Sequence, residues 1–139
     1  MDLGGTSIRS VVAMVGDAIP TIASRDQRAT PRDGADAIVD AVVASAREAM
    51  RQANVAPADV VAAGCSSPGP LDHVRGVVLE TPNLVGFRDI SLADRLADGI
   101  GTRVFIDRDT CMAAIAEGMV GAASGATDFV YVTVSTGVG

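Results

Sequence analysis

The chain has 139 residues, a net charge of −6 at neutral pH and 48% hydrophobic residues, of which few are aromatic. This length suits one domain whose core is built from Ala, Val, Ile and Leu. The acidic balance argues against wrapping nucleic acid, which requires clustered Lys and Arg, and no segment reaches the ~18 apolar residues of a membrane span.

The first half of the chain predicts a hairpin, a helix and a strand. Residues 8–15 and 19–25 are apolar, β-branched runs on either side of a turn, which is typical of two antiparallel strands. Asp33 can cap a helix that extends to about Ala53, since apolar side chains recur there at helical spacing. Residues 60–64 predict a short strand, and residues 65–70 a loop, because Pro68 and Pro70 cannot join a ladder.

The second half alternates between strands and helices. Strands are expected at residues 76–80, 103–107 and 129–134. Ser91 and Asp94 resemble a capping box for a helix that ends near Gly99 or Gly101, and residues 111–120 form an Ala-rich helical pattern before Gly121. A hairpin followed by this alternation predicts an α/β layer structure.

Two glycine-rich segments have residue types suited to binding phosphate. In residues 2–6, Asp-Leu-Gly-Gly-Thr, backbone without Cβ atoms lets N–H groups form a nest for an anion, and Asp2 could hold a metal ion. Residues 133–139 end in a similar Ser/Thr-Gly-rich loop. The alternatives are an ordinary hairpin turn for the first segment and a glycine-rich terminus for the second.

Three further segments suit sugar binding and proton transfer. Residues 67–72 and 81–87 are rigid loops that, taken alone, are equally consistent with simple turns. Asp109 follows a predicted strand and precedes a helix, where a carboxylate can accept a proton from a substrate hydroxyl. The alternative is that Asp109 only caps that helix.

In this order, the segments resemble the N-terminal portion of the ROK (repressor, ORF, kinase) family of bacterial glucokinase-like sugar kinases, over essentially all of the chain. The resemblance implies an α/β fold of the actin-like ATPase (ribonuclease H-like) type, a mixed sheet with flanking helices, truncated at both ends. It implies a small N-terminal lobe over residues 1–122, whose first strand is missing, and the start of a C-terminal nucleotide and sugar lobe over residues 123–139.

The resemblance also implies ATP-dependent phosphoryl transfer to the 6-hydroxyl of a hexose, with ATP and Mg²⁺ as cofactors. Asp109 would be the general base, and Asp2 would lie near the metal. The cofactor-binding residues would be Asp2, Gly4, Gly5, Thr6, Thr136 and Gly137. The substrate-binding residues would be Pro70, Asn83, Arg108 and Asp109.

Arg108 departs from the family pattern, which usually has a sugar-contacting Asn at this position. Arg is larger and cannot accept a hydrogen bond. Either the pocket is altered and prefers an acidic or phosphorylated ligand, or Arg108 points away and pairs with Asp107. Of the nearby polar residues, we expect His73 to be an exposed loop residue and Glu117 to brace a backbone amide.

Both ends bear on the expected activity. Residues 8–15 would lose a strand partner because no apolar strand precedes Asp2, and the chain stops inside the second phosphate loop, so we expect no appreciable kinase activity from it alone. A sugar-responsive transcriptional regulator of the same family and a non-catalytic sugar-binding module remain alternatives.

Location and partners are the last expectations. Cys65 and Cys111 match no zinc pattern, so we predict no zinc and a reduced, cytoplasmic setting. The expected partner is a small-molecule sugar, with no nucleic acid and no membrane, and a homodimer is compatible with the resemblance.

Overall fold

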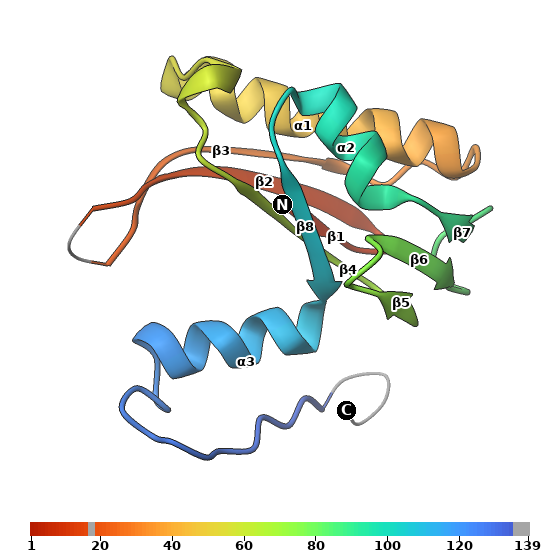
Figure 1. The fold of residues 1–139 in the computed structure, drawn as a ribbon. Helices are drawn as coiled ribbons and strands as arrows, with labels where there is room; N and C mark the ends of the chain where they lie inside the picture. Colours follow the sequence, from red (N-terminus) through yellow and green to blue (C-terminus); the bar gives the residue numbers. More distant parts are fainter. Residues whose placement is uncertain (17–18, 135–139) are drawn as a thin grey trace.

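The computed structural model describes residues 1–16 and 19–134, and its centre is a mixed sheet (Figure 1). Within these residues the sheet has five strands in the order β3-β2-β1-β4-β8. They are β1 (Asp2–Leu3), β2 (Ser7–Met14), β3 (Thr21–Ala29), β4 (Ala63–Ser67) and β8 (Val104–Arg108). β1, β4 and β8 are parallel, whereas β2 is antiparallel to both of its neighbours. The predicted mixed sheet is confirmed.

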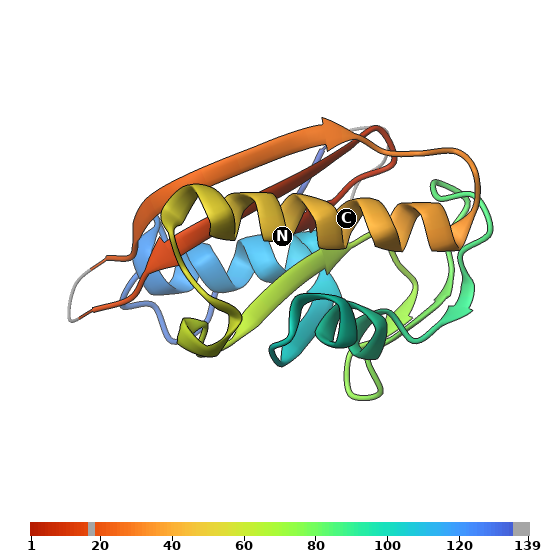
Figure 2. The ribbon, with the colours of Figure 1, turned by 90° about the horizontal axis from the view of Figure 1, so that it is seen from above.

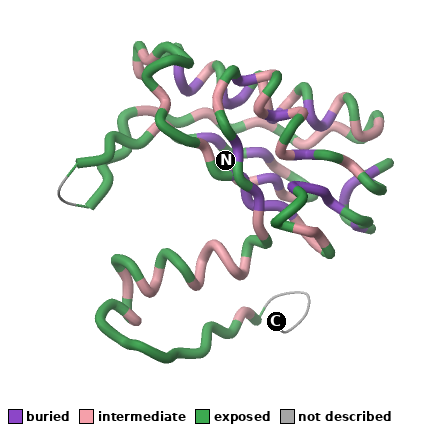
Figure 3. Tube along the Cα trace, in the orientation of Figure 1, coloured by how far each residue is buried: buried purple, intermediate pink, exposed green. Residues whose placement is uncertain are grey.

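Helices flank both sides of this sheet (Figures 1 and 2). α1 (Ala35–Ala53) and α2 (Leu92–Ile100) cover one face, whereas α3 (Asp109–Val120) leaves the end of β8 on the other side. The apolar stripes of the first two helices explain their position, since Val42 of α1 and Leu96 of α2 are completely buried. Figure 3 shows the buried residues gathered between these helices and the sheet, whereas α3 contributes none.

A second, smaller sheet lies beside the first. Its strands β5 (Leu71–Asp72), β6 (Val77–Glu80) and β7 (Arg88–Ile90) are antiparallel neighbours in the order β5-β6-β7. The sequence predicted β6 but not β5 or β7, because strands of two or three residues are too short to show alternation. A short 3₁₀ helix, Pro57–Asp59, precedes β4.

The strand predicted at residues 60–64 lies further along the chain than expected. β4 begins at Ala63, and Cys65, Ser66 and Ser67 pair in register with residues 106–108 of β8. The prediction of a loop from residue 65 is therefore wrong for its first three residues. Proline excludes a ladder only from Pro68 onward, and the edge of β8 supplies a partner up to that point.

Three local predictions are wrong at the ends of elements. Gly34, not Asp33, is the N-cap of α1, and its positive φ of 101° makes glycine suitable there. Ser91 does cap α2, but neither side chain of the expected capping box makes a cap hydrogen bond. Residues 129–133 are irregular and not a strand, and of the predicted strand only Val134 takes part in a β-bridge.

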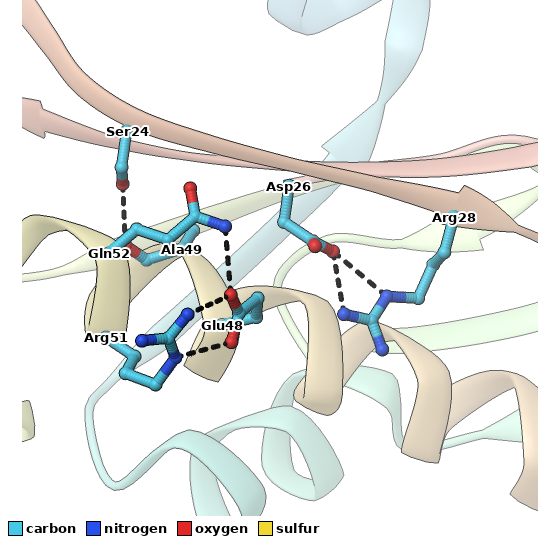
Figure 4. A network of polar contacts seen from close by, with 7 residues as sticks. All are labelled: Ser24, Asp26, Arg28, Glu48, Ala49, Arg51 and Gln52. Carbon is cyan, nitrogen blue, oxygen red and sulfur yellow. Dashed lines mark hydrogen bonds and ion pairs between the residues drawn. The ribbon is translucent and has the colours of Figure 1, made fainter.

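Polar contacts join α1 to β3 on the outer side of the molecule (Figure 4). The Ser24 hydroxyl of β3 donates a 2.6 Å hydrogen bond to the Ala49 carbonyl of α1. On the exposed face of α1, hydrogen bonds from the Arg51 guanidinium, at 2.6 and 2.8 Å, lower the pKa of Glu48 to about 2. The neighbouring ion pair is Arg28–Asp26, at 2.8 Å. Asp26 and Arg28 belong to the edge strand β3, and charged residues on an edge strand discourage pairing with other chains.

β1 has only two residues, so β2 and β4 are not bridged along their full length. A cavity of about 600 Å³ lies beside Met1, lined mainly by residues 10–15 and 59–64. The Met1 ammonium donates a 2.7 Å hydrogen bond to the Gly64 carbonyl at this cavity. β2 retains β3 on its other side throughout, so the expected loss of a strand partner affects one side of β2 only. Among the helices of the described residues, none could span a bilayer.

Candidate functional site

Three of the five predicted segments follow parallel strands and meet at one edge of the sheet. The parallel strands β1, β4 and β8 all have their carboxyl ends there. β1 leads into the Gly4-Gly5 turn, β4 into residues 68–70, and β8 into Asp109. In open α/β sheets, ligands bind outside the carboxyl ends of the strands. The predicted phosphate-binding residues Thr136 and Gly137, in the segment at residues 133–139, lie outside the described residues.

The turn after β1 has the geometry of a small anion cradle. The Gly4 N–H donates to the Ser7 carbonyl at 3.0 Å, and the Thr30 hydroxyl donates to the Gly4 carbonyl at 2.7 Å. These bonds fix the turn, while the N–H groups of Gly5 and Thr6 find no acceptor among the described residues. Two adjacent free N–H groups fit the oxygens of a phosphate.

Asn83 lies against this same turn, although 78 positions separate it from Gly5. A Cβ atom on Gly5 would lie 3.0 Å from the Asn83 carbonyl oxygen, so the close approach favours glycine. The Asn83 N–H donates to the buried Thr81 hydroxyl at 3.4 Å, and the residue itself is exposed. The fold therefore brings a predicted sugar-binding residue beside the predicted phosphate loop.

Asp2 is held between two neighbouring strands. One carboxylate oxygen accepts a 2.7 Å hydrogen bond from the Ser66 hydroxyl of β4. The other forms an ion pair with the Arg9 guanidinium of β2, at 3.2 Å. No group of three His, Cys, Asp or Glu side chains in the described part of the chain is arranged to hold a metal ion. A single half-exposed carboxylate suits Mg²⁺, which keeps several waters and takes few protein ligands besides phosphates.

Asp109 is the first residue of α3, directly after β8, and its side chain is exposed. One carboxylate oxygen accepts a 2.8 Å hydrogen bond from the Thr110 N–H. This bond resembles the capping alternative, but the N-cap position belongs to Arg108 and the second oxygen has no partner among the described residues. The position thus leaves one carboxylate oxygen free to accept a proton.

Arg108, the last residue of β8, lines a cavity of about 220 Å³ with Pro70. The other residues around it are Leu71, His73, Asp107 and Cys111. The alternative that Arg108 pairs with Asp107 is wrong, because the Asp107 carboxylate accepts the main-chain N–H of Arg108, at 2.7 Å, and not its guanidinium. The guanidinium instead donates to the Cys111 sulfur at 3.5 Å.

Three residues that support the site were not identified from the sequence as functional. The hydroxyls of Thr30 and Ser66 fix the Gly4 carbonyl and the Asp2 carboxylate, and Cys111 borders the small cavity. No sequence motif marks Thr30 or Ser66, since each meets its partner across the sheet.

Two predictions about side chains near the site are confirmed. His73 is exposed. Glu117 braces a backbone amide, accepting the Ala122 N–H at 2.8 Å beyond the end of α3.

Cys65, in the strand behind Asp2, is completely buried. Burial raises the pKa of its thiol to about 11, although the nearby Met1 ammonium acts in the opposite direction. A thiol in this state is inert as a nucleophile, so Cys65 has a packing role.

The profile of one protein family, described as "ROK family", matches residues 1–139. A glucokinase of Streptomyces coelicolor is 32% identical over the whole chain, and the match covers 41% of that protein. A xylose repressor of Bacillus subtilis is 32% identical over 83 residues, which are 60% of this chain and 21% of the repressor. The chain thus spans about two-fifths of the length of the glucokinase.

Solved structures show the same architecture. A ROK hexokinase from Thermus thermophilus superposes with a TM-score of 0.86 at 37% identity, over 99% of this chain and 43% of the hexokinase. A ROK family glucokinase from Streptomyces griseus, in complex with glucose and AMPPNP, superposes with a TM-score of 0.82 at 33% identity, over 99% of this chain and 41% of that one. The expected actin-like fold, present here in its N-terminal part, is confirmed.

Proposed function

Because the chain belongs to the ROK family, we propose that it is the N-terminal part of an ATP-dependent sugar kinase that phosphorylates the 6-hydroxyl of a hexose. The observation that best supports this proposal is the meeting, at one sheet edge, of a glycine turn with two free N–H groups and an exposed carboxylate at the start of α3. Phosphoryl transfer depends on alignment and charge neutralisation more than on covalent chemistry by the protein. A backbone cradle for the phosphates and an oriented base for the hydroxyl would supply the alignment.

The phosphate side of the proposed site consists of backbone and one carboxylate. The free N–H groups of Gly5 and Thr6 would bind phosphate oxygens of ATP, with Thr136 and Gly137 as a second contact. Mg²⁺, when bound near Asp2, neutralises charge on those phosphates. We propose that Ser66 and Arg9 orient the Asp2 carboxylate, which would hold the metal directly or through water, since each oxygen keeps a second lone pair.

The sugar side of the proposed site contains the base and three positioning groups. The free oxygen of Asp109 would accept the proton of the 6-hydroxyl as the hydroxyl oxygen attacks the terminal phosphorus of ATP; the bond to the bridging oxygen of the β-phosphate breaks and ADP leaves. The Asn83 amide would hydrogen-bond other sugar hydroxyls. Pro70 and Arg108, which both line the small cavity, would limit which sugar enters.

We also propose a division of the chain at about residue 122, with residues 1–122 as a small lobe and residues 123–139 as the start of a second one. Because the relatives are more than twice as long, turnover is expected to need the rest of their length. Cytoplasmic location, the absence of nucleic-acid and membrane partners, and a homodimer remain predictions. A sugar-responsive regulator is the second candidate, and the xylose repressor among the relatives favours it.

The test is Asp109→Asn in a protein that carries this chain at the full length of its relatives. We expect kcat for hexose phosphorylation by ATP to fall by roughly 10²–10⁴-fold, because a positioned general base contributes about that much. Circular dichroism should be unchanged, and Asp94→Asn, on the exposed side of α2, should retain activity as a control. Full activity in Asp109→Asn would show that another group is the base. Binding of operator DNA without phosphorylation of any hexose would favour the regulator.

A further inference from the structure

The small cavity beside Asp109 has the size of a subsite. Its volume of about 220 Å³ is below the roughly 300–1,000 Å³ typical of pockets for complete drug-sized ligands. It therefore suits one substituent of a bound sugar. Its walls come from the loop after β4 and from the junction of β8 with α3, the two segments that border the proposed sugar site.

The side chain of Arg108 is held in place along its stem. A Cβ atom on Gly69 would lie 3.1 Å from Cδ and 3.3 Å from Cγ of Arg108, so the stem packs directly on the Gly69 backbone. At the far end, the guanidinium donates to the Cys111 sulfur at 3.5 Å, which is a weak hydrogen bond. The contacts orient the guanidinium without satisfying its other N–H groups.

Arg108 has no carboxylate partner among the described residues, unlike five arginines that do. The two nearest acidic residues in the chain each accept a main-chain N–H, Asp107 from Arg108 and Asp109 from Thr110. The guanidinium thus faces the cavity with its charge uncompensated by a direct ion pair. His73 also lines the cavity and offers a further ring nitrogen.

We propose that this site selects a sugar bearing an anionic substituent, a carboxylate or a phosphate, which the guanidinium of Arg108 binds in the small cavity. The inference rests on the proposed sugar-binding function. A planar guanidinium matches two oxygens of a carboxylate or phosphate at once, whereas a neutral hydroxyl uses one donor. Asp107 also lines the cavity, so the anion binds with its charge against Arg108 and away from that carboxylate.

Cys111 provides a reporter for the test, because it lines the cavity, whereas Cys65 is completely buried. The rate of Cys111 alkylation by iodoacetamide would be measured in the 139-residue chain with two matched ligand pairs. The pairs are glucose 1-phosphate with glucose, and N-acetylmuramate with N-acetylglucosamine; all four keep a free 6-hydroxyl. Inorganic phosphate alone is the control, and titration calorimetry gives Kd values that do not depend on thiol reactivity.

We expect the anionic member of at least one pair to protect Cys111 at a concentration about tenfold or more below its neutral partner, as charge-assisted hydrogen bonds contribute about that much. Which pair responds distinguishes a phosphate from a carboxylate. Arg108→Asn should abolish the preference, whereas Arg47→Asn, which removes the same charge from the exposed face of α1, should retain it.

Three results would overturn the inference while leaving a sugar site intact: equal or better protection by the neutral sugars, a preference that survives Arg108→Asn, or a preference also lost in Arg47→Asn. Protection by inorganic phosphate as strong as that by glucose 1-phosphate would indicate an adventitious ion only and would also overturn it. If no sugar protects Cys111 or produces heat, the proposed sugar-binding function fails together with the inference.

Discussion

Gly5 and Gly16 form a matched pair for testing the close approach between the first loop and Asn83. A Cβ atom on Gly5 would lie 3.0 Å from the Asn83 carbonyl oxygen, whereas one on Gly16 would meet nothing within 4 Å. We expect Gly5→Ala to lower the free energy of unfolding by about 1–3 kcal/mol, the usual cost of overpacking. Gly16→Ala should leave it unchanged or raise it by less than ~1 kcal/mol. Urea denaturation measures both, and equal effects would contradict the close contact.

Cys65 gives the chain a specific response to alkaline pH. Its folded-state pKa of about 11 exceeds the ordinary value of 9.0, so the unfolded chain loses this proton first. The contribution of the neutral Cys65 thiol to the free energy of unfolding is complete below pH 9 and is lost as the pH rises towards 11. A shift of this size corresponds to roughly 2–3 kcal/mol.

The measurement is the free energy of unfolding by urea at several values between pH 8 and pH 11. In Cys65→Ala, the free energy of unfolding should decline less steeply with pH across that window. The cavity left by the smaller side chain lowers the free energy at every pH and does not affect this slope. Cys111→Ala should keep the decline, since that thiol is only partly buried. An unchanged slope in Cys65→Ala would show that other groups cause the decline.

At the scale of elements, α1 docks on the sheet through apolar side chains, and two serines at this interface differ in their hydrogen bonding. The Ser24 hydroxyl donates to the Ala49 carbonyl at 2.6 Å, whereas the completely buried Ser45 hydroxyl has no partner among the described residues. Ser24→Ala should lower the free energy of unfolding by about 1 kcal/mol, because it removes the hydrogen bond that joins β3 to α1.

Ser45→Ala should instead raise the free energy of unfolding, by up to roughly 1 kcal/mol, since burying an unpaired hydroxyl is costly. Thermal or urea denaturation of the two variants gives the comparison directly. If Ser45→Ala destabilises the chain as much as Ser24→Ala does, the Ser45 hydroxyl has a partner, such as a buried water.

At the scale of the whole molecule, the cavity beside Met1 is a gap in the sheet with the width of one strand. Continuing the register of Asp2 backwards, the position before Met1 falls opposite Val11 of β2 and Gly64 of β4. A fused segment of about five residues, apolar and β-branched, should extend β1 there and raise the urea midpoint, because it pairs with both strands and fills about 600 Å³.

The control is a segment of equal length with alternating prolines, which cannot complete the ladder. It should leave the midpoint near that of the unmodified chain. An equal increase with both segments would attribute the effect to removal of the Met1 ammonium and not to strand pairing.

Several elements could be predicted from the sequence because their signals lie in neighbouring residues. The apolar spacing of α1 identified that helix, a capping-box pattern with a glycine stop identified α2, and the two β-branched runs identified the β2–β3 hairpin. Asp109 and the Gly4-Gly5 turn could be assigned to a common site because the order of the segments resembles the ROK family. The structure places both after parallel strands, whose carboxyl ends share one edge.

The remaining features depend on contacts between distant segments. Residues 65–67 are a strand because β8 pairs with them, although two prolines follow at once, whereas the apolar run at residues 129–133 is irregular. The unpaired guanidinium of Arg108 could not be inferred either, since it depends on Asp107 bonding to the main chain and on Gly69 packing against the stem. Periodicity records which residues face a core; it does not record which partner a strand end or a charged side chain meets, because that is fixed only when the chain folds on itself.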